Sequence, residues 1–183
     1  CKIGIVNSDD VHCSQVVKGH TCKLESYGLK TGADLLAWDM QLLKEEGSLG
    51  VNFKVSGLEE MEVYVASPGR FSVYNALTAI AICRHFGVGR ENIQKALLEA
   101  KVKGRIEPVK VSDEFTLLID YAHNAMSLKS LLSTTRALAS RFTSTTIRIP
   151  SLSDSSLILL IPSSFLSATI CAMDLIISAL FTP

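Results

Sequence analysis

The chain has 183 residues, 48% hydrophobic and 20% charged, a balance that fits a globular protein with a buried core. Its 18 basic residues equal its 18 acidic ones, which gives no reason to expect nucleic acid as a partner. Residues 1–20 lack a basic stretch followed by a long apolar run, so no signal peptide is expected. The five cysteines are irregularly spaced and predict a cytoplasmic protein with free thiols. The chain begins at Cys1 rather than Met, and we expect the native N-terminus to lie upstream.

Short apolar runs alternate with turn residues in the first third of the chain, and helical spacing takes over after Pro68-Gly69. Asn7-Ser8-Asp9-Asp10 ends the first apolar run and predicts a turn or a helix N-cap. The elements expected in chain order are strands at 3–6 and 22–27 around a helix at 9–18, an antiparallel hairpin at 34–43 and 50–55, a strand at 62–66, helices from Ser72 to Gly87 and over 90–100, a strand at 115–119 and a helix at 125–138. The pattern is α/β.

Four residues near the N-terminus have side chains that bind metals, namely His12, Cys13, His20 and Cys22. Zinc sites usually draw on closely spaced ligand pairs in a turn, whereas here the first pair is adjacent and the second is expected at a strand start. Ordinary core or surface roles are therefore favoured, and we assign no metal site to the chain.

The first segment with chemical potential surrounds Asn75, just after the Pro68-Gly69 turn. Asn75 is expected in the first turn of a helix, where backbone N–H groups are unpaired and can face a ligand. A carboxamide both donates and accepts, so this side chain is suited to the edge of an adenine ring. The alternative is a plain helix start with a solvated Asn, which this segment alone favours.

The second segment is Lys103-Gly104-Arg105-Ile106-Glu107-Pro108. An Arg that follows a Gly can lie over a nucleotide or pair with phosphate oxygens through two hydrogen bonds. The alternative is a surface ion pair between Arg105 and Glu107, and the segment alone favours that pair.

The third segment places Asp120, Tyr121 and His123 directly after an apolar strand. Ligands of open α/β sheets bind at the carboxyl ends of strands. Asp120 is suited to accept hydrogen bonds from ribose hydroxyls, and His123 to approach phosphate. The alternative, equally weighted, is an Asp that caps the next helix.

These three segments, in this order, resemble the Mur ligases, most closely the members that add the third residue of the peptide stem. Asn7-Ser8-Asp9-Asp10 also resembles an Asn-x-Asp-Asp stretch of those enzymes, and the resemblance covers about residues 3–138. It implies that Asn75 contacts adenine, that Arg105 lines the nucleotide, and that Asp120 binds ribose with Tyr121 and His123 beside it. The implied fold is the C-terminal part of the central ATP-binding domain over residues 1–106, followed over 107–140 by the first β-α unit of a Rossmann-like C-terminal domain.

The resemblance also implies a reaction and its partners. ATP phosphorylates a carboxylate of a UDP-N-acetylmuramoyl-peptide, and the amine of an amino acid then attacks the acyl phosphate to form an amide. Magnesium ions neutralise the phosphates. The implied cellular role is peptidoglycan synthesis, with consequences for cell shape and division, in the cytoplasm and with no membrane or nucleic acid partner.

Several family features are absent from the sequence. No Gly-Lys dipeptide occurs, so a phosphate-gripping loop of the G-x-x-x-x-G-K-[ST] type is missing. The family carries that loop and its metal-binding residues upstream of the matched region. We therefore expect the chain alone to be inactive, and three alternatives stay open. They are a non-catalytic remnant, a relative such as folylpolyglutamate synthase, cyanophycin synthetase or an amidotransferase subunit, and a protein tethered to a membrane.

Residues 141–183 differ in composition from the rest of the chain. All 11 glycines lie at or before Gly104, and this tail has no Lys, Glu, Asn, Gln, His, Val or Tyr. It is compatible with a membrane helix over residues 157–181, with a buried segment, or with a shifted reading frame. The abrupt change favours the shifted frame, and we leave the tail unassigned.

Overall fold

The computed structural model describes residues 1–45, 48–109, 115–122, 125–139, 146–148 and 157–162. The chain divides into two compact units. The first comprises residues 1–43 and 50–101, and the second comprises residues 44–49 and 102–183.

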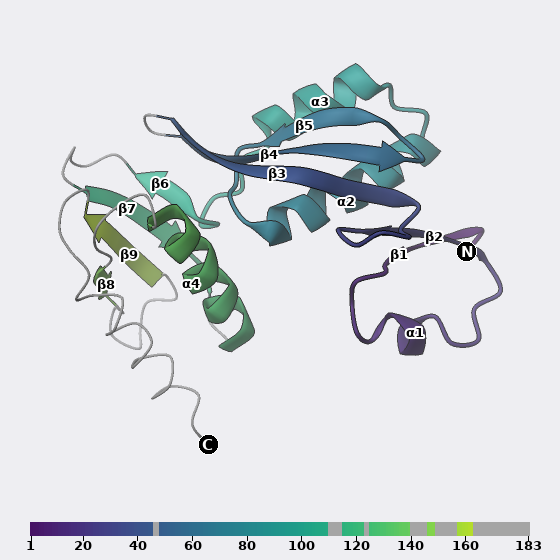
Figure 1. The fold of residues 1–183 in the computed structure, drawn as a ribbon, viewed down its shortest axis with the longest axis horizontal. Coiled ribbons are helices and arrows are strands. Elements are labelled where there is room, and N and C mark those ends of the chain that lie inside the picture. The colour runs from purple at the N-terminus through teal and green to yellow at the C-terminus, as the bar shows by residue number, and fades with distance from the viewer. Residues whose placement is uncertain (46–47, 110–114, 123–124, 140–145, 149–156, 163–183) are drawn as a thin grey trace. The chain divides into compact units, whose positions relative to one another are not determined.

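A five-stranded sheet forms the framework of the first unit (Figure 1). Its strands, in spatial order, are β1 (Ile3–Asn7), β2 (Lys23–Gly28), β3 (Leu35–Glu45), β4 (Ser48–Gly57) and β5 (Met61–Val65). Strands β1, β2 and β3 pair in parallel, whereas β4 and β5 pair antiparallel. The neighbouring β3 and β4 occupy the positions expected for the hairpin. The carboxyl ends of β1 and β2 therefore lie at the same edge of the sheet.

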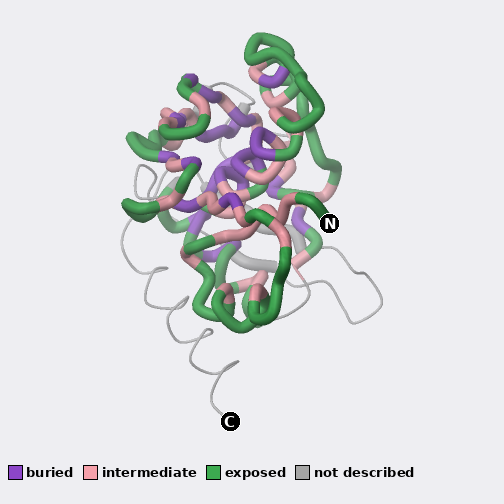
Figure 2. The backbone as a smooth tube through the Cα atoms, turned by 90° about the vertical axis from the view of Figure 1, so that its right-hand side faces the viewer, coloured by how far each residue is buried: buried purple, intermediate pink, exposed green. Residues whose placement is uncertain are grey.

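Two helices cover the core of this unit. Helix α2 (Arg70–His85) contacts β1, β2 and β5, and α3 (Arg90–Glu99) contacts β5 and α2. The side chains that α2 directs at the sheet recur every three or four residues, as an amphipathic helix requires. They are Val73, Ala76, Leu77, Ile80 and Ala81, and Figure 2 marks such buried positions in purple. With Phe53 and Val63 of the sheet, which are at most 1% exposed, they form one apolar cluster.

Strand β3 changes its alternation part-way along. Leu35 and Ala37 are buried, two residues apart, as one face of a strand should be. Leu42 also packs against the same core, although it is an odd number of residues further on. Asp39 lies between them with a φ of 52°, a left-handed conformation that is uncommon for a residue other than glycine. One extra residue at this point thus restores the inward direction of the second half of β3.

The helix expected over residues 9–18 is shorter in the structure, where α1 is only Cys13–Val16. The prediction of its extent was wrong because side chains take the backbone N–H groups that would open the helix. Asn7 Oδ1 accepts from the Asp9 N–H at 3.0 Å, and Asp10 Oδ1 accepts from the His12 N–H at 2.8 Å. Such local side-chain bonds favour turns over helix.

The second unit has a four-stranded sheet in the order β6-β7-β9-β8, with α4 (Ala125–Ala139) after β7. Its strands are β6 (Glu107–Val109), β7 (Phe115–Asp120), β8 (Thr146–Arg148) and β9 (Leu157–Pro162), and neighbours pair antiparallel. The expected strand-helix unit is present as β7 and α4. Strands β8 and β9 come from the tail, whose remaining residues lie outside the described ranges, as does most of the apolar run at 157–181. Among the described residues, no helix is long and apolar enough to cross a membrane.

Candidate functional site

Asp120 is the last residue of β7, and its carboxylate is bound by a backbone N–H from the segment before β6. The residue is 7% exposed, and its Oδ2 accepts a hydrogen bond of 2.8 Å from the backbone N–H of Ile106. Ile106 is 2% exposed and has a φ of 44°. A left-handed conformation is unfavourable for a β-branched residue, so the bond to Asp120 and the burial of Ile106 hold it there.

Two further bonds fold the segment from Gly104 to Glu107 against the end of β7. The Gly104 N–H donates to Glu107 Oε2 at 2.8 Å, and the Gly104 carbonyl accepts from the Tyr121 N–H at 2.9 Å. Gly104 has a φ of 70°, which glycine adopts without strain. We call residues 104–107 the strap. It presents Arg105 at the strand end where a nucleotide was expected.

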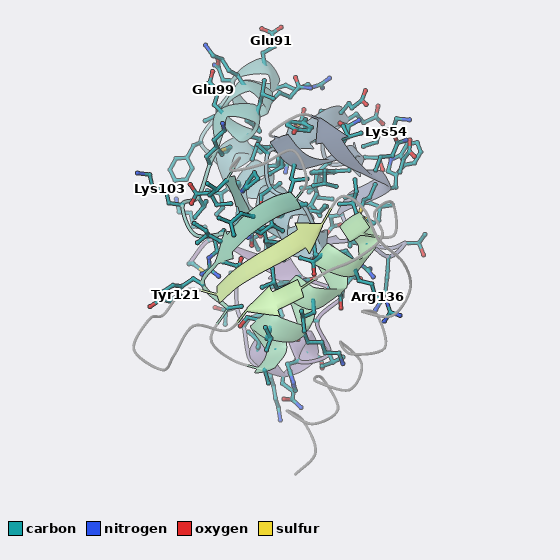
Figure 3. All side chains as sticks on the ribbon, turned by 90° about the vertical axis from the view of Figure 1, so that its left-hand side faces the viewer. Lys54, Glu91, Glu99, Lys103, Tyr121 and Arg136 are labelled. Atoms are coloured by element: carbon teal, nitrogen blue, oxygen red, sulfur yellow. The ribbon has the colours of Figure 1, made fainter. Side chains whose placement is uncertain are left out.

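The side chains of the other predicted residues here are exposed. Arg105 is exposed, and no ion pair within the described part of the chain includes it, so the alternative pair with Glu107 is not formed. Glu107 binds the strap instead. Tyr121 is 47% exposed and its side chain points outward in Figure 3. His123 lies outside the described residues.

Asn75 belongs to the first unit, whereas Asp120 belongs to the second. Helix α2 begins at Arg70, two residues earlier than expected, because Gly69 takes a φ of 101° and a ψ of 159° that suit glycine alone. Asn75 therefore lies in the second turn, and its expected position in the first turn was wrong. It is exposed, and its side chain makes no hydrogen bond to any described residue.

A polar connection that the sequence did not indicate joins β1 to α2. Asp9 Oδ2 accepts hydrogen bonds from the Leu29 N–H at 2.6 Å and from the Tyr74 hydroxyl at 2.9 Å. Partial burial opposes ionisation of Asp9. The bonds from Leu29 and Tyr74 and the charge of Lys30 nevertheless hold its pKa below the ordinary 3.8. Burial and the bond to Asp9 raise the pKa of Tyr74. The contact thus joins a carboxylate to a neutral phenol.

Comparison with known proteins assigns the family. Residues 1–83 match the profile of the Mur ligase middle domain. A UDP-N-acetylmuramoyl-L-alanyl-D-glutamate–2,6-diaminopimelate ligase of Caldanaerobacter subterraneus subsp. tengcongensis is 33% identical over 132 residues, which are 72% of this chain and 27% of that protein. The ligase of the same name from Halalkalibacterium halodurans is 36% identical over 140 residues, 75% of this chain and 28% of that protein. The matched part of the chain belongs to the Mur ligase family.

Solved structures agree with the Mur ligase fold. A MurF structure from Acinetobacter baumannii superposes with a TM-score of 0.61 at 23% identity, over 72% of this chain and 28% of that one. A folylpolyglutamate synthetase from Lactobacillus casei gives 0.58 at 17% identity, over 78% and 36%. At these identities the likeness shows the fold alone. The chain spans just over a quarter of the length of the curated Mur ligases that it matches.

Metal ligands do not gather in the described part of this Mur ligase segment. No group of three His, Cys, Asp or Glu side chains that could hold an ion occurs there, and His12, Cys13, His20 and Cys22 form no such set. Mg²⁺ in nucleotide sites is usually held by one or two carboxylates, water and the phosphates themselves, so Mg²⁺ binding stays a prediction.

Proposed function

We propose that this chain is part of an ATP-dependent ligase that adds an amino acid to UDP-N-acetylmuramoyl-dipeptide in peptidoglycan synthesis, as UDP-N-acetylmuramoyl-tripeptide synthetase does. The names of the relatives support this reaction class. In that reaction a substrate carboxylate oxygen would attack the γ-phosphorus of ATP and release ADP. An amine would then attack the acyl carbon, and phosphate would leave as the amide forms. We assign neither step, nor any Mg²⁺, to residues of this chain.

The part that we assign to this chain is contact with the adenosine and phosphate of ATP. The observation that carries the assignment is the Asp120 carboxylate. Its Oδ2 is taken by the Ile106 N–H, while Oδ1 makes no hydrogen bond to another described residue. A carboxylate oxygen accepts readily from hydroxyl groups, and the two neighbouring hydroxyls of a ribose are suitable donors. Asp120 would thus use one oxygen for the strap and the other for the sugar.

The remaining residues have roles consistent with their exposure. Arg105 extends from the strap with no paired carboxylate among the described residues, and a guanidinium of this kind suits a phosphate. We assign Tyr121, which directly follows β7, and His123, two residues further along the sequence, to the nucleotide as well. In the first unit, the exposed amide of Asn75 would donate to and accept from the edge of adenine.

The test compares nucleotides that differ in one group. AMP should bind the chain more tightly than 2′,3′-dideoxy-AMP, by roughly three- to tenfold, because the dideoxy sugar cannot donate to Asp120. The variant Asp120→Asn keeps an acceptor for Ile106 but replaces the other oxygen by an NH₂ group, and it should bind both nucleotides equally. A variant that still prefers AMP contradicts the ribose role. Equal binding of both nucleotides by the unaltered chain contradicts it as well.

Adenine recognition has a separate test. AMP should bind more tightly than GMP, and Asn75→Ala should remove that preference. A non-catalytic remnant should show neither preference, whereas a folylpolyglutamate synthetase relative should show both, as the proposed ligase does. The full-length parent enzyme, assayed with the dipeptide precursor or with a folate, separates the two ligase classes.

A further inference from the structure

A polar contact from the loop after β1 holds the N-terminal half of α2, which carries Asn75, whereas Arg84 and His85 at the other end of the helix contact Glu25 of β2. Tyr74 immediately precedes Asn75, and its hydroxyl donates to Asp9 Oδ2 at 2.9 Å. Successive residues of a helix are fixed 100° apart around its axis. Any rotation or slide of α2 that breaks the Tyr74 contact therefore moves Asn75 by a similar amount.

Asp9 is itself firmly placed at the carboxyl ends of β1 and β2. Its Oδ2 accepts the Leu29 N–H at 2.6 Å, and its own N–H donates to Asn7 Oδ1 at 3.0 Å. Gly28 allows this approach, because a Cβ there would lie 3.1 Å from Asp9 Oδ2. The carboxylate is thus attached to two paired strands whose backbones belong to the sheet.

The apolar face of α2 has a different role, which is to pack the helix against the sheet. Val73, Ala76 and Leu77 are at most 2% exposed and set the distance of the helix from the sheet. Contacts of this kind are non-directional, so they resist separation far better than they resist a small rotation or slide. A hydrogen bond prefers a narrow range of distances and angles. Asn75 has no hydrogen-bond partner of its own among the described residues, so its direction depends on the helix.

We infer that Asp9 and Tyr74 are positioning residues for base recognition: their hydrogen bond sets the rotation and height of α2 from which Asn75 meets adenine. This inference rests on the proposed function, in which Asn75 reads the base. A recognition group has to be held within about 0.5 Å of its working position by supporting contacts. The Asn-x-Asp-Asp stretch thereby has a role in selectivity that acts through α2.

The experiment measures AMP and GMP affinities of the full chain and of four variants. Tyr74→Phe keeps the ring and removes the hydroxyl, and Asp9→Asn removes the charge at nearly constant shape. The controls are Tyr64→Phe, which removes another phenol of the same unit, and Asp10→Asn, which removes the adjacent carboxylate. The ratio of AMP to GMP affinity should fall roughly three- to tenfold in Tyr74→Phe and less in Asp9→Asn, because the amide oxygen is a weaker acceptor. Both controls should keep the ratio.

A general loss of stability would weaken both nucleotides together, so the ratio separates positioning from folding. If Asn75→Ala lowers the ratio while Tyr74→Phe and Asp9→Asn leave it unchanged, the positioning inference is overturned and the proposed adenine contact stands. If the unaltered chain has no preference, or Asn75→Ala keeps it, the adenine contact itself is wrong.

Amide hydrogen exchange, measured without nucleotide, tests the positioning role of Asp9 and Tyr74 independently of nucleotide affinity. Exchange at Tyr74 to Ala76 should accelerate several-fold in Tyr74→Phe but not in Tyr64→Phe, with exchange at Ile80 to Cys83 unchanged in both. Equal exchange in all the proteins overturns the inference.

Discussion

Asp9 and Asp120 occupy similar positions, each at or just after the end of a strand, yet their carboxylates are used differently. Asp9 gives one oxygen to two donors, one of them a side chain 65 residues away. Asp120 is buried and gives one oxygen to a single backbone N–H 14 residues away. The first therefore fixes a helix, while the second fixes a strap and retains an oxygen. Residue type and position in the strand are therefore not enough to distinguish a carboxylate with a structural role from one that is proposed to bind a ligand.

The largest effect should come from removing the buried acceptor at Asp120. Asp120→Ala leaves the Ile106 N–H buried without a partner and should lower the free energy of unfolding by about 1–3 kcal/mol. Asp120→Asn retains an acceptor oxygen and should lose less than half of that. Urea unfolding followed by circular dichroism measures both. Equal losses would mean that the bond to Ile106 contributes little, and the comparison with Asp9 would fail.

A methyl group at Gly28 tests how tightly Asp9 is held. The new Cβ of Gly28→Ala would lie 2.9 Å from Ser8 Oγ and 3.1 Å from Asp9 Oδ2. The two side-chain ends have to move, which should lower the free energy of unfolding by about 1 kcal/mol. The loss should shrink in an Asp9→Ala background, where one obstacle is gone. Strictly additive losses would indicate that Asp9 moves aside freely.

Lowering the pH should weaken the Asp9 contact, with a smaller effect on stability than the substitutions at Asp120 and Gly28. The folded-state pKa of Asp9 lies below its ordinary 3.8, so its stabilising contribution is present above that value and is lost as the pH falls through the lower, folded one. Glu25 and Asp34 also have lowered pKa values, so the whole unit should lose stability in the same direction. Stability measured from pH 6 to pH 3 should therefore fall less steeply for Asp9→Asn than for the unaltered chain. Parallel curves would contradict the ionised contact.

The smallest effect on stability is expected at Arg105. Arg105→Ala removes an exposed side chain with no ion pair among the described residues, and the free energy of unfolding should change by less than about 0.5 kcal/mol. Its affinity for AMP should nevertheless fall about threefold if the guanidinium meets phosphate. Lys103→Ala, which removes an exposed cation two residues away, is the control and should leave the affinity unchanged. A stability loss at Arg105 with unchanged affinity would make it structural.

Local patterns predicted the elements of the first unit well. Alternation in β3 to β5 and the apolar spacing of α2 and α3 come from residues close in sequence, and the observed strands and helices follow them. Helix α2 begins earlier than predicted, because the φ of 101° at Gly69 cannot be predicted from residue type alone. Residues 9–12 formed turns because Asn and Asp side chains competed for backbone donors.

The site was less predictable because its contacts join distant residues. For Asp120 the sequence left a cap of the following helix and a ribose contact equally open, and neither predicts the bond from Ile106 that the structure shows. The sequence also suggested an ion pair for Arg105, whereas Glu107 turned back to Gly104. The Asp9–Tyr74 contact depends on the packing of α2 over β1, which no local pattern contains.

The extra residue in β3 has a consequence for which sequence changes this strand can accept. Before Asp39 the odd-numbered side chains enter the core, and beyond it an even-numbered one, Leu42, does. A single-residue deletion at Asp39 would leave one uninterrupted alternation in which Leu42, then four residues after Ala37, still enters the core. A substitution of Asp39 by glycine would keep the extra residue and remove the strain of a left-handed conformation at a residue other than glycine. Among related chains, Asn, Asp or Gly should therefore recur at position 39, and a single-residue gap there should also be accepted.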